Sequence, residues 1–322
     1  MWTPPNRLLA ARIAGQFGLV TRSQALGAGV TRKAVACHLD SGRWIVVHPG
    51  VYLTTPGRSD WSVRAMSALL WAGAGAVLYR VSAGYAWGLV RAEPEVIEVA
   101  VPYPRLVTSR ELIAVTRSRT SPARLDPLAW PHRISAPHTA LDLSSGHDID
   151  RAVTLAARAL DLRLCTSGQL VAALSLRPKQ PHRALLLEAL TDVGDGSESA
   201  AELRYVRDVE RAHGLPRGRR QAPVGDGRRR DHEYEEFGVV VEIDGRLGHV
   251  GWTNRQRDGR RDREAAADGR LTIRVFWPDL LPPCALAGEV GTILRTRGWT
   301  GWPQRCGPHC GLREGSVPLW GT

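Results

Sequence analysis

The residues whose types and spacing could do chemistry are carboxylates around a β-branched run in the last third of the chain. The sequence VVVEID at 239–244 predicts a buried strand ending in Glu242 and Asp244, which share a face because strand side chains alternate. Asp231 lies upstream on a segment that could pair with this strand through a turn at Gly238. Carboxylates crowded at one sheet end repel one another and lose hydration, and a hard cation such as Mg²⁺ relieves both costs. The spacing therefore indicates a metal site.

The same residues also fit a structure without chemistry. Asp244-Gly245 is an ordinary turn sequence, and Asp231 follows three arginines with which it could form a surface ion pair. Spacing alone leaves both interpretations open.

The elements that must position these carboxylates form an alternating series. The sequence predicts a helix at 199–213, strands at 221–224, 230–234 and 239–244, a basic helix at about 255–268 and a strand at 271–276. This order is typical of a small α/β sheet with helices on both faces. A Gly-, Asp- and Ser-rich linker, TDVGDGSES at 191–199, predicts that the domain spans 195–297 and begins there.

Short motifs extend over residues 195–285: SAAE at 199–202, HGLP at 213–216, Asp231, EIDG at 242–245, His249, Asp258, Arg261-Asp262, Gly269 and IRVFW at 273–277. With these motifs the chain resembles endonuclease-like domains related to very-short-patch repair endonucleases, within the restriction-endonuclease-like, PD-(D/E)XK, class. The resemblance implies that Glu202, Asp231 and Glu242 bind Mg²⁺ or Mn²⁺, which activates water to attack a DNA phosphodiester.

One position departs from the pattern of that class. The class carries Lys two residues after the last acid, where this chain carries Asp244. The subfamily that the chain resembles has Asp at this position, and His249, Arg260 or Arg261 could supply the missing proton donor or cation.

The composition favours an anionic partner. The formal net charge is +11, and all but Lys33 and Lys179 of the 43 basic residues are arginines. Arginines cluster on both sides of the carboxylate strand, at Arg217, Arg219, Arg220, Arg228, Arg229 and Arg230 and at Arg255, Arg257, Arg260, Arg261 and Arg263. Double-stranded DNA is the first candidate, and a solvated arginine face is the alternative.

Residues 1–60 predict a winged helix. Apolar residues at 7–17 have helical spacing, Thr21 and Thr31 can cap two further helices, and β-rich runs flank the turn at 48–50. This region, with GLVTRSQALGAGVT, SGRW and PGVY, resembles the N-terminal domain of AbiEi-type antitoxins from type IV toxin–antitoxin systems. The resemblance implies a toxin partner and a third helix in the major groove, with four residues near DNA: Arg32, Lys33, His38 and Arg43.

The region at 61–190 predicts an antitoxin-like middle domain of mixed, mainly helical structure. Two helices at 61–89 are interrupted near Gly73, strands follow at 96–101 and 112–115, and helices continue from about 138 to 190. The expected fold class is therefore multidomain, α+β and α/β, with an irregular tail at 298–322.

The five cysteines are odd in number and scattered, which favours free thiols in a reducing compartment. Cys284, Cys306, His309 and Cys310 could be drawn as a zinc site, but only one pair has a CxxC-like spacing, which argues against zinc. No apolar run reaches the roughly 20 residues needed to cross a bilayer, and no signal-peptide core is present. We expect a cytoplasmic location without membrane contact, and the sequence sets no oligomeric state.

Three functions compete. The first is a Mg²⁺-dependent DNA endonuclease addressed by its winged helix, and the second is an antitoxin-like transcriptional regulator with an inactive nuclease-like domain. The three retained carboxylates favour the enzyme, and the missing lysine favours the regulator. The third, a two-carboxylate glycan hydrolase, suits the basic composition poorly.

Overall fold

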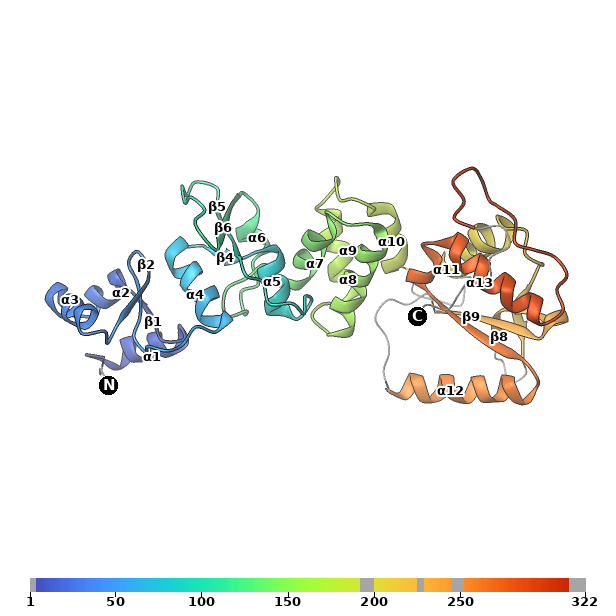
Figure 1. The fold of residues 1–322 in the computed structure, drawn as a ribbon, viewed down its shortest axis with the longest axis horizontal. Coiled ribbons are helices and arrows are strands. Elements are labelled where there is room, and N and C mark those ends of the chain that lie inside the picture. The colour runs from blue at the N-terminus through green and yellow to red at the C-terminus, as the bar shows by residue number, and fades with distance from the viewer. Residues whose placement is uncertain (1–3, 192–199, 225–228, 245–251, 313–322) are drawn as a thin grey trace. The chain divides into compact units, whose positions relative to one another are not determined.

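The structure is a computed structural model of the chain that describes all residues except 1–3, 192–199, 225–228, 245–251 and 313–322. It contains two compact units, residues 1–143 and 144–322 (Figure 1). No helix within the described ranges is long and apolar enough to span a membrane. The predicted linker at 191–199 falls, from residue 192 on, outside these ranges. The predicted borders at 60 and 190 stay predictions.

The first unit begins with three short helices and a three-stranded sheet. The elements in chain order are α1 (Arg7–Gly15), β1 (Leu19–Thr21), α2 (Arg22–Gly27), α3 (Arg32–Asp40), β2 (Ile45–His48) and β3 (Val51–Leu53). The strands run antiparallel in the order β1-β3-β2. The predicted helices and hairpin are confirmed, and the arrangement is compatible with a winged helix. Strand β1 was not predicted, because three residues are too few to show a period.

Side-chain caps explain where these helices begin. Asn6 Oδ1 accepts from the Leu9 amide at 2.8 Å, and Thr31 Oγ1 accepts from the Ala34 amide at 3.1 Å. Thr21 forms a capping box, in which its hydroxyl and the Gln24 side chain satisfy each other's backbone N–H groups. Each cap satisfies amides that a helix N-terminus would otherwise leave without partners.

The remainder of the first unit is a second sheet covered by helices. Its elements are α4 (Trp61–Ala72), β4 (Val77–Leu78), α5 (Arg80–Trp87), β5 (Ile97–Pro102), β6 (Ile113–Ser118), α6 (Ser121–Arg124) and α7 (Ala136–Ser144). Strand β5 is central, antiparallel to β4 and parallel to β6. Its apolar side chains pack against α4 and α5 around Trp61 and Leu69. The predicted helix break near Gly73 and both predicted strands are confirmed.

The second unit opens with the helices α8 (Ile149–Asp161), α9 (Ser167–Ser175) and α10 (Arg183–Thr191), as predicted. The elements that carry the carboxylates follow: α11 (Ala200–Arg204), a π-helix η1 (Tyr205–Arg211), β7 (Arg219–Pro223), β8 (Arg229–Tyr234), a 3-10 turn η2 (Glu235–Phe237), β9 (Val239–Asp244), α12 (Trp252–Ala267), β10 (Leu271–Phe276), a 3-10 turn η3 (Trp277–Leu280) and α13 (Pro283–Thr296).

The four strands form one mixed sheet in the order β10-β9-β8-β7. The three strands β7, β8 and β9 form an antiparallel meander, and β10 runs parallel to β9. Helices α11 and α13 lie to one side of this sheet and α12 to the other (Figure 1). The predicted small sheet with helices on both faces is therefore confirmed, and its restriction-endonuclease-like identity stays a prediction.

The described part of the tail, residues 299–312, contains neither helix nor strand, as predicted. The tail runs along α13, and this contact was not predicted. A Cβ at Gly291 would overlap Pro303, so the close approach of tail and helix requires glycine at this position. The guanidinium of Arg295 stacks on the ring of Trp302 at 3.6 Å, and its Nη1 donates to the Gly301 carbonyl at 2.7 Å.

Candidate nucleic-acid interface and carboxylate site

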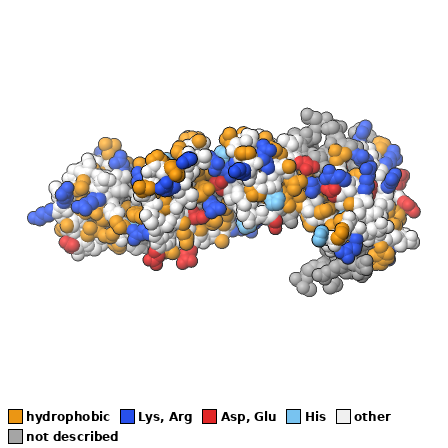
Figure 2. Space-filling model, turned by 90° about the horizontal axis from the view of Figure 1, so that it is seen from above, with side chains coloured by type: hydrophobic (Ala, Val, Ile, Leu, Met, Phe, Trp, Pro, Cys, Tyr) orange, Lys and Arg blue, Asp and Glu red, His pale blue; other side chains and the backbone are white. Residues whose placement is uncertain are grey.

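Helix α3 presents one exposed stripe to solvent. Val35 is buried, and the stripe on the outer side consists of Arg32, Lys33, Ala36, Cys37 and Asp40. Both basic residues lie in the first turn, and small side chains occupy the middle of the stripe. A helix of this kind can lie close to a polyanion, because no bulky side chain in the middle of the stripe keeps the helix backbone away from it. Figure 2 shows Lys and Arg side chains exposed over this N-terminal region.

The hairpin beside α3 completes the surface. Ile45 and Val46 on β2 are 44% and 55% exposed, whereas Trp44, immediately before them, is buried. Arg43 is exposed, and its Nε donates to Ser41 Oγ at 2.9 Å, which holds the guanidinium near the C-terminal end of α3. Three of the four residues predicted to lie near DNA are therefore exposed: Arg32 and Lys33 on α3, and Arg43 just before the β2–β3 hairpin.

The fourth, His38, is placed differently. Its half-buried ring stacks on Trp44, with centroids 5.0 Å apart. Burial, and secondly the charge of Arg43, lower the pKa of His38 below its ordinary value, so the ring is neutral at pH 7. In this position the His38 ring packs on Trp44, the residue just before β2.

Among the predicted metal ligands, Glu202 lies on α11 and is buried. Its Oε2 accepts from Gln221 Nε2 at 2.7 Å. Gln221 lies opposite Asp231 in the unshifted β7–β8 register, at the one position between Arg219 and Pro223 where no pair is formed, and its φ is positive at 47°. The residues on both sides of Gln221 stay paired with β8.

Asp231 and Glu242 occupy adjacent strands. The β8–β9 register pairs His232 with Val241, and Asp231 and Glu242 are the next residues along each strand. Asp231 Oδ2 accepts from the Ile243 amide at 2.8 Å, so this carboxylate takes the place of a ladder bond where the strands part. The predicted hairpin neighbours are thus side by side, while Glu202 is bonded to another strand.

Glu242 lines a cavity of about 370 Å³ between the sheet and α12, together with Val240, Arg230, Asp262 and Asp268. Glu202, Asp231 and Glu242 are not among the described side chains that converge as a cluster of potential metal ligands. The side chain of Asp244 and all of His249 lie outside what the structure describes, so their predicted roles stay predictions.

Ion pairs hold many of the arginines around this cavity. Glu233, which is 6% exposed, accepts from Arg230 at 2.8 Å and from Arg270 at 2.7 Å. Arg274 bonds Asp262 at 2.9 Å. Arg260 is exposed and pairs with Glu264 at 3.0 Å, and the side chain of Arg261 is not described. The basic clusters that the sequence shows are therefore partly neutralised within the fold.

A buried polar network links η1 to β8, and the sequence did not indicate it. His232 Nε2 donates to Glu210 Oε2 at 2.6 Å, and the Gly218 amide donates to the same oxygen at 2.9 Å. The hydroxyls of Tyr205 and Tyr234 lie 3.1 Å apart, and both rings contact His232. Burial raises the pKa of both tyrosines, which keeps the hydroxyls protonated. A Cβ at Gly218 would overlap His232, so this strand entry needs glycine.

A second set of potential ligands includes His213, which follows η1. His213, Cys284, Cys306 and Cys310 bring four ligand atoms within 4.8 Å of one another. The histidine of the set is therefore His213 and not His309, which is exposed. The set drawn from the sequence, which the spacing argued against, contained His309, because His213 lies almost a hundred residues upstream of the tail cysteines and only the fold brings it to them. The cysteines form no disulfide, as predicted.

Comparison with known proteins concerns the surface formed by α3 and the β2–β3 hairpin. Residues 7–55 match the family described as the transcriptional regulator AbiEi antitoxin. No curated protein matches the chain. A solved structure, the RV2827C protein from Mycobacterium tuberculosis, is 20% identical over 58% of this chain and 75% of its own, with a TM-score of 0.35. The matched segment spans α1 to β3 and includes the exposed stripe of α3.

Proposed function

We propose that this chain is a DNA-binding transcriptional regulator of the antitoxin type, which places α3 in the major groove and the β2–β3 hairpin against the backbone. The observation that carries the proposal is the exposed stripe of α3, with Arg32 and Lys33 in its first turn, inside the segment that matches the antitoxin regulator family. Neither residue forms an ion pair with any residue that the structure describes. Phosphates can therefore take both charges without displacing a protein partner.

The test is a salt titration of DNA binding by the full chain. Replacing Arg32 and Lys33 together by Ala should lower affinity and reduce the slope of log K against log salt by about 0.9 per lost phosphate contact. Arg12→Ala is the matched control, because Arg12 is equally exposed but lies on α1. An unchanged slope in the double variant, or an equal loss in the control, would rule out the groove assignment.

The match to antitoxin regulators also supports a protein partner. By analogy with the family, that partner is a toxin whose synthesis or activity the chain limits. Co-expression with the product of the neighbouring gene, followed by size-exclusion chromatography, tests for a complex. Separate elution of the two proteins at micromolar concentration would contradict a stable pair.

A second candidate activity is hydrolysis of DNA phosphodiesters. The observation that favours it is the position of Asp231 and Glu242 on adjacent strands, beside a cavity that arginines flank. These carboxylates, with Glu202, offer the oxygen ligands that Mg²⁺ or Mn²⁺ prefers. Such an ion would acidify a bound water and neutralise charge on the phosphate. To join the site, Glu202 would exchange its bond with Gln221 for the ion.

Supercoiled plasmid incubated with and without Mg²⁺ tests this candidate. Free ion at about 100 times its Kd would also stabilise the fold by roughly 2.7 kcal/mol. Glu242→Ala should abolish both cleavage and stabilisation, and Glu236→Ala, an exposed acid in the turn before the same strand, should leave both unchanged. Stabilisation without cleavage would leave a regulator with a relic site, and absence of both would exclude the ion.

A further inference from the structure

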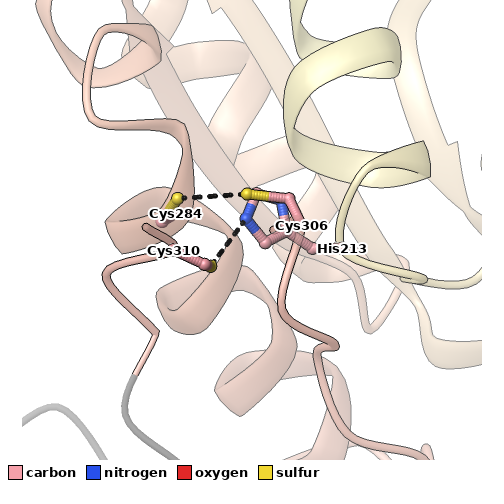
Figure 3. Close-up of side chains that lie close together, drawn as sticks. All are labelled: His213, Cys284, Cys306 and Cys310. Carbon is pink, nitrogen blue, oxygen red and sulfur yellow. Dashed lines mark hydrogen bonds between the residues drawn. The ribbon is translucent and has the colours of Figure 1, made fainter. Parts of the chain in front are cut away.

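The C-terminal tail contacts the rest of the second unit at a cluster of three thiols and one imidazole. His213 follows η1, Cys284 lies in the first turn of α13, and Cys306 and Cys310 lie in the irregular tail. The four side chains point toward one another from three separate segments (Figure 3). His213 and Cys310 are buried, and Cys284 is half-buried.

The distances in the cluster differ from those of a disulfide. Cys284 Sγ and Cys306 Sγ lie 3.6 Å apart, whereas a disulfide bond measures about 2.05 Å. Cys310 Sγ and His213 Nε2 lie 3.7 Å apart. In a tetrahedron with zinc–sulfur bonds of about 2.3 Å and zinc–nitrogen bonds of about 2.05 Å, neighbouring ligand atoms are roughly 3.8 Å and 3.5 Å apart. The two observed separations are close to the edges of such a tetrahedron, and all four ligand atoms lie within 4.8 Å of one another.

The imidazole is already oriented for a metal. His213 Nδ1 donates to the Val209 carbonyl at 3.2 Å, which leaves the lone pair on Nε2, the nitrogen that faces Cys310. A hydrogen bond from the other ring nitrogen to a carbonyl is the usual support of a zinc-bound histidine, because it fixes both the tautomer and the ring angle. Here η1 supplies that carbonyl.

The surroundings also suit a charged site. Arg305 donates to the Cys310 carbonyl at 3.3 Å, so a guanidinium lies beside the site. Three thiolates and a divalent ion carry one net negative charge, which this cation offsets.

We propose that His213, Cys284, Cys306 and Cys310 bind one structural Zn²⁺ that holds the tail against α13 and the end of η1. Four protein ligands leave no position open for water or substrate, so the ion supports the fold and does not act in catalysis. The tail needs such a link because it has neither helix nor strand. Its other attachments include the bond from the Gln304 amide to the His213 carbonyl at 2.7 Å.

The test is metal analysis of the full chain, purified under reducing conditions without chelator. We expect about one zinc ion per chain, and the Co²⁺-substituted protein should show thiolate charge-transfer and tetrahedral d–d absorption bands. Cys306→Ser and Cys310→Ser should each lower zinc affinity at least about tenfold in competition with a chromophoric chelator. The site at Cys306 is exposed, so this variant disturbs packing least.

Two controls make the assignment specific. His309→Ala changes the exposed histidine next to Cys310 and should retain the zinc affinity of the parent chain, and Cys165→Ser removes a thiol outside the cluster and should do the same. Urea unfolding of the full chain reports whether the second unit of each variant is intact.

Three results would overturn the proposal. In the first, the parent chain neither contains zinc nor takes it up in titration. In the second, the Cys306→Ser and Cys310→Ser variants bind zinc as tightly as the parent chain. In the third, the protein isolated under reducing conditions contains a Cys284–Cys306 disulfide. A loss of zinc in His309→Ala equal to that in Cys310→Ser would overturn the assignment of His213. An iron–sulfur spectrum in place of bound zinc would overturn the choice of metal.

Discussion

The N-terminal helices and hairpin and the sheet of the second unit both carry several arginines, but the arginines differ in their ion pairing. On α3, Arg32 and Lys33 face solvent and form no ion pair with any described residue. Around β8, β9 and β10, Arg230, Arg270 and Arg274 bond to Glu233 or Asp262. Figure 2 shows acidic and basic side chains interleaved on the second unit. A count of basic residues therefore identifies a DNA surface less well than their pairing does.

The two regions also differ in what determines their structure. Helices α2 and α3 begin at threonines that cap them through bonds three residues long. The helix α11–η1 is held instead by buried bonds to strands that follow more than twenty residues later, through Glu210 and His232. A single local cap contributes little to stability, whereas a buried hydrogen-bond network is costly to break.

The largest expected effect tests the buried network. Glu210→Ala leaves His232 Nε2 and the Gly218 amide without their shared acceptor inside the protein. A buried donor left without an acceptor costs about 1–3 kcal/mol, and here two donors lose theirs. Urea unfolding of the full chain, followed through tryptophan fluorescence, should show this loss in the transition of the second unit. Glu236→Ala, at an exposed site, is the control. A loss below about 1 kcal/mol would show that water replaces the missing carboxylate.

A smaller effect tests the caps. Thr31→Ala removes the acceptor for the Ala34 amide and should destabilise the first unit by about 1 kcal/mol. Thr31→Ser keeps a hydroxyl and should retain most of the stability. The same urea titration measures both variants, now in the transition of the first unit. Equal stability of the Ala and Ser variants would mean that tertiary packing alone holds the start of α3.

The smallest effect tests the exposed pair on α12. Arg260→Ala breaks a bond to Glu264, which is worth less than about 0.5 kcal/mol because both side chains are well exposed. In DNA binding by the full chain, this variant should change the salt slope less than Arg32→Ala does, because Glu264 offsets the charge of Arg260. A larger change than that of Arg32→Ala would place the main phosphate contacts on the second unit and reverse the comparison.

Local signals in the sequence were enough for most of the fold. Each of these signals involves only a few neighbouring residues, so the sequence alone shows it. They are the capping threonines, the turn at 48–50, the break near Gly73 and the β-branched run at 239–244. The elements that were missed include β1, β4 and α6, which have three, two and four residues, and the helix α13. Such short segments show no period, so their conformation depends on what they pack against. Helix α13 was not predicted although its buried residues Leu286, Val290 and Leu294 have helical spacing.

The sites divide in the same way. By itself the sequence determined that Arg32 and Lys33 begin a capped helix and that Arg43 lies just before the hairpin that follows it. It also placed Asp231 and Glu242 on two strands of one hairpin. Only the tertiary structure decided that Glu202 bonds Gln221, that arginines near the sheet bond Glu233, and that His213, not His309, joins the three cysteines. The physical reason is range: caps and periods act between neighbours along the chain, whereas ion pairs and ligand shells form between residues that only folding brings together.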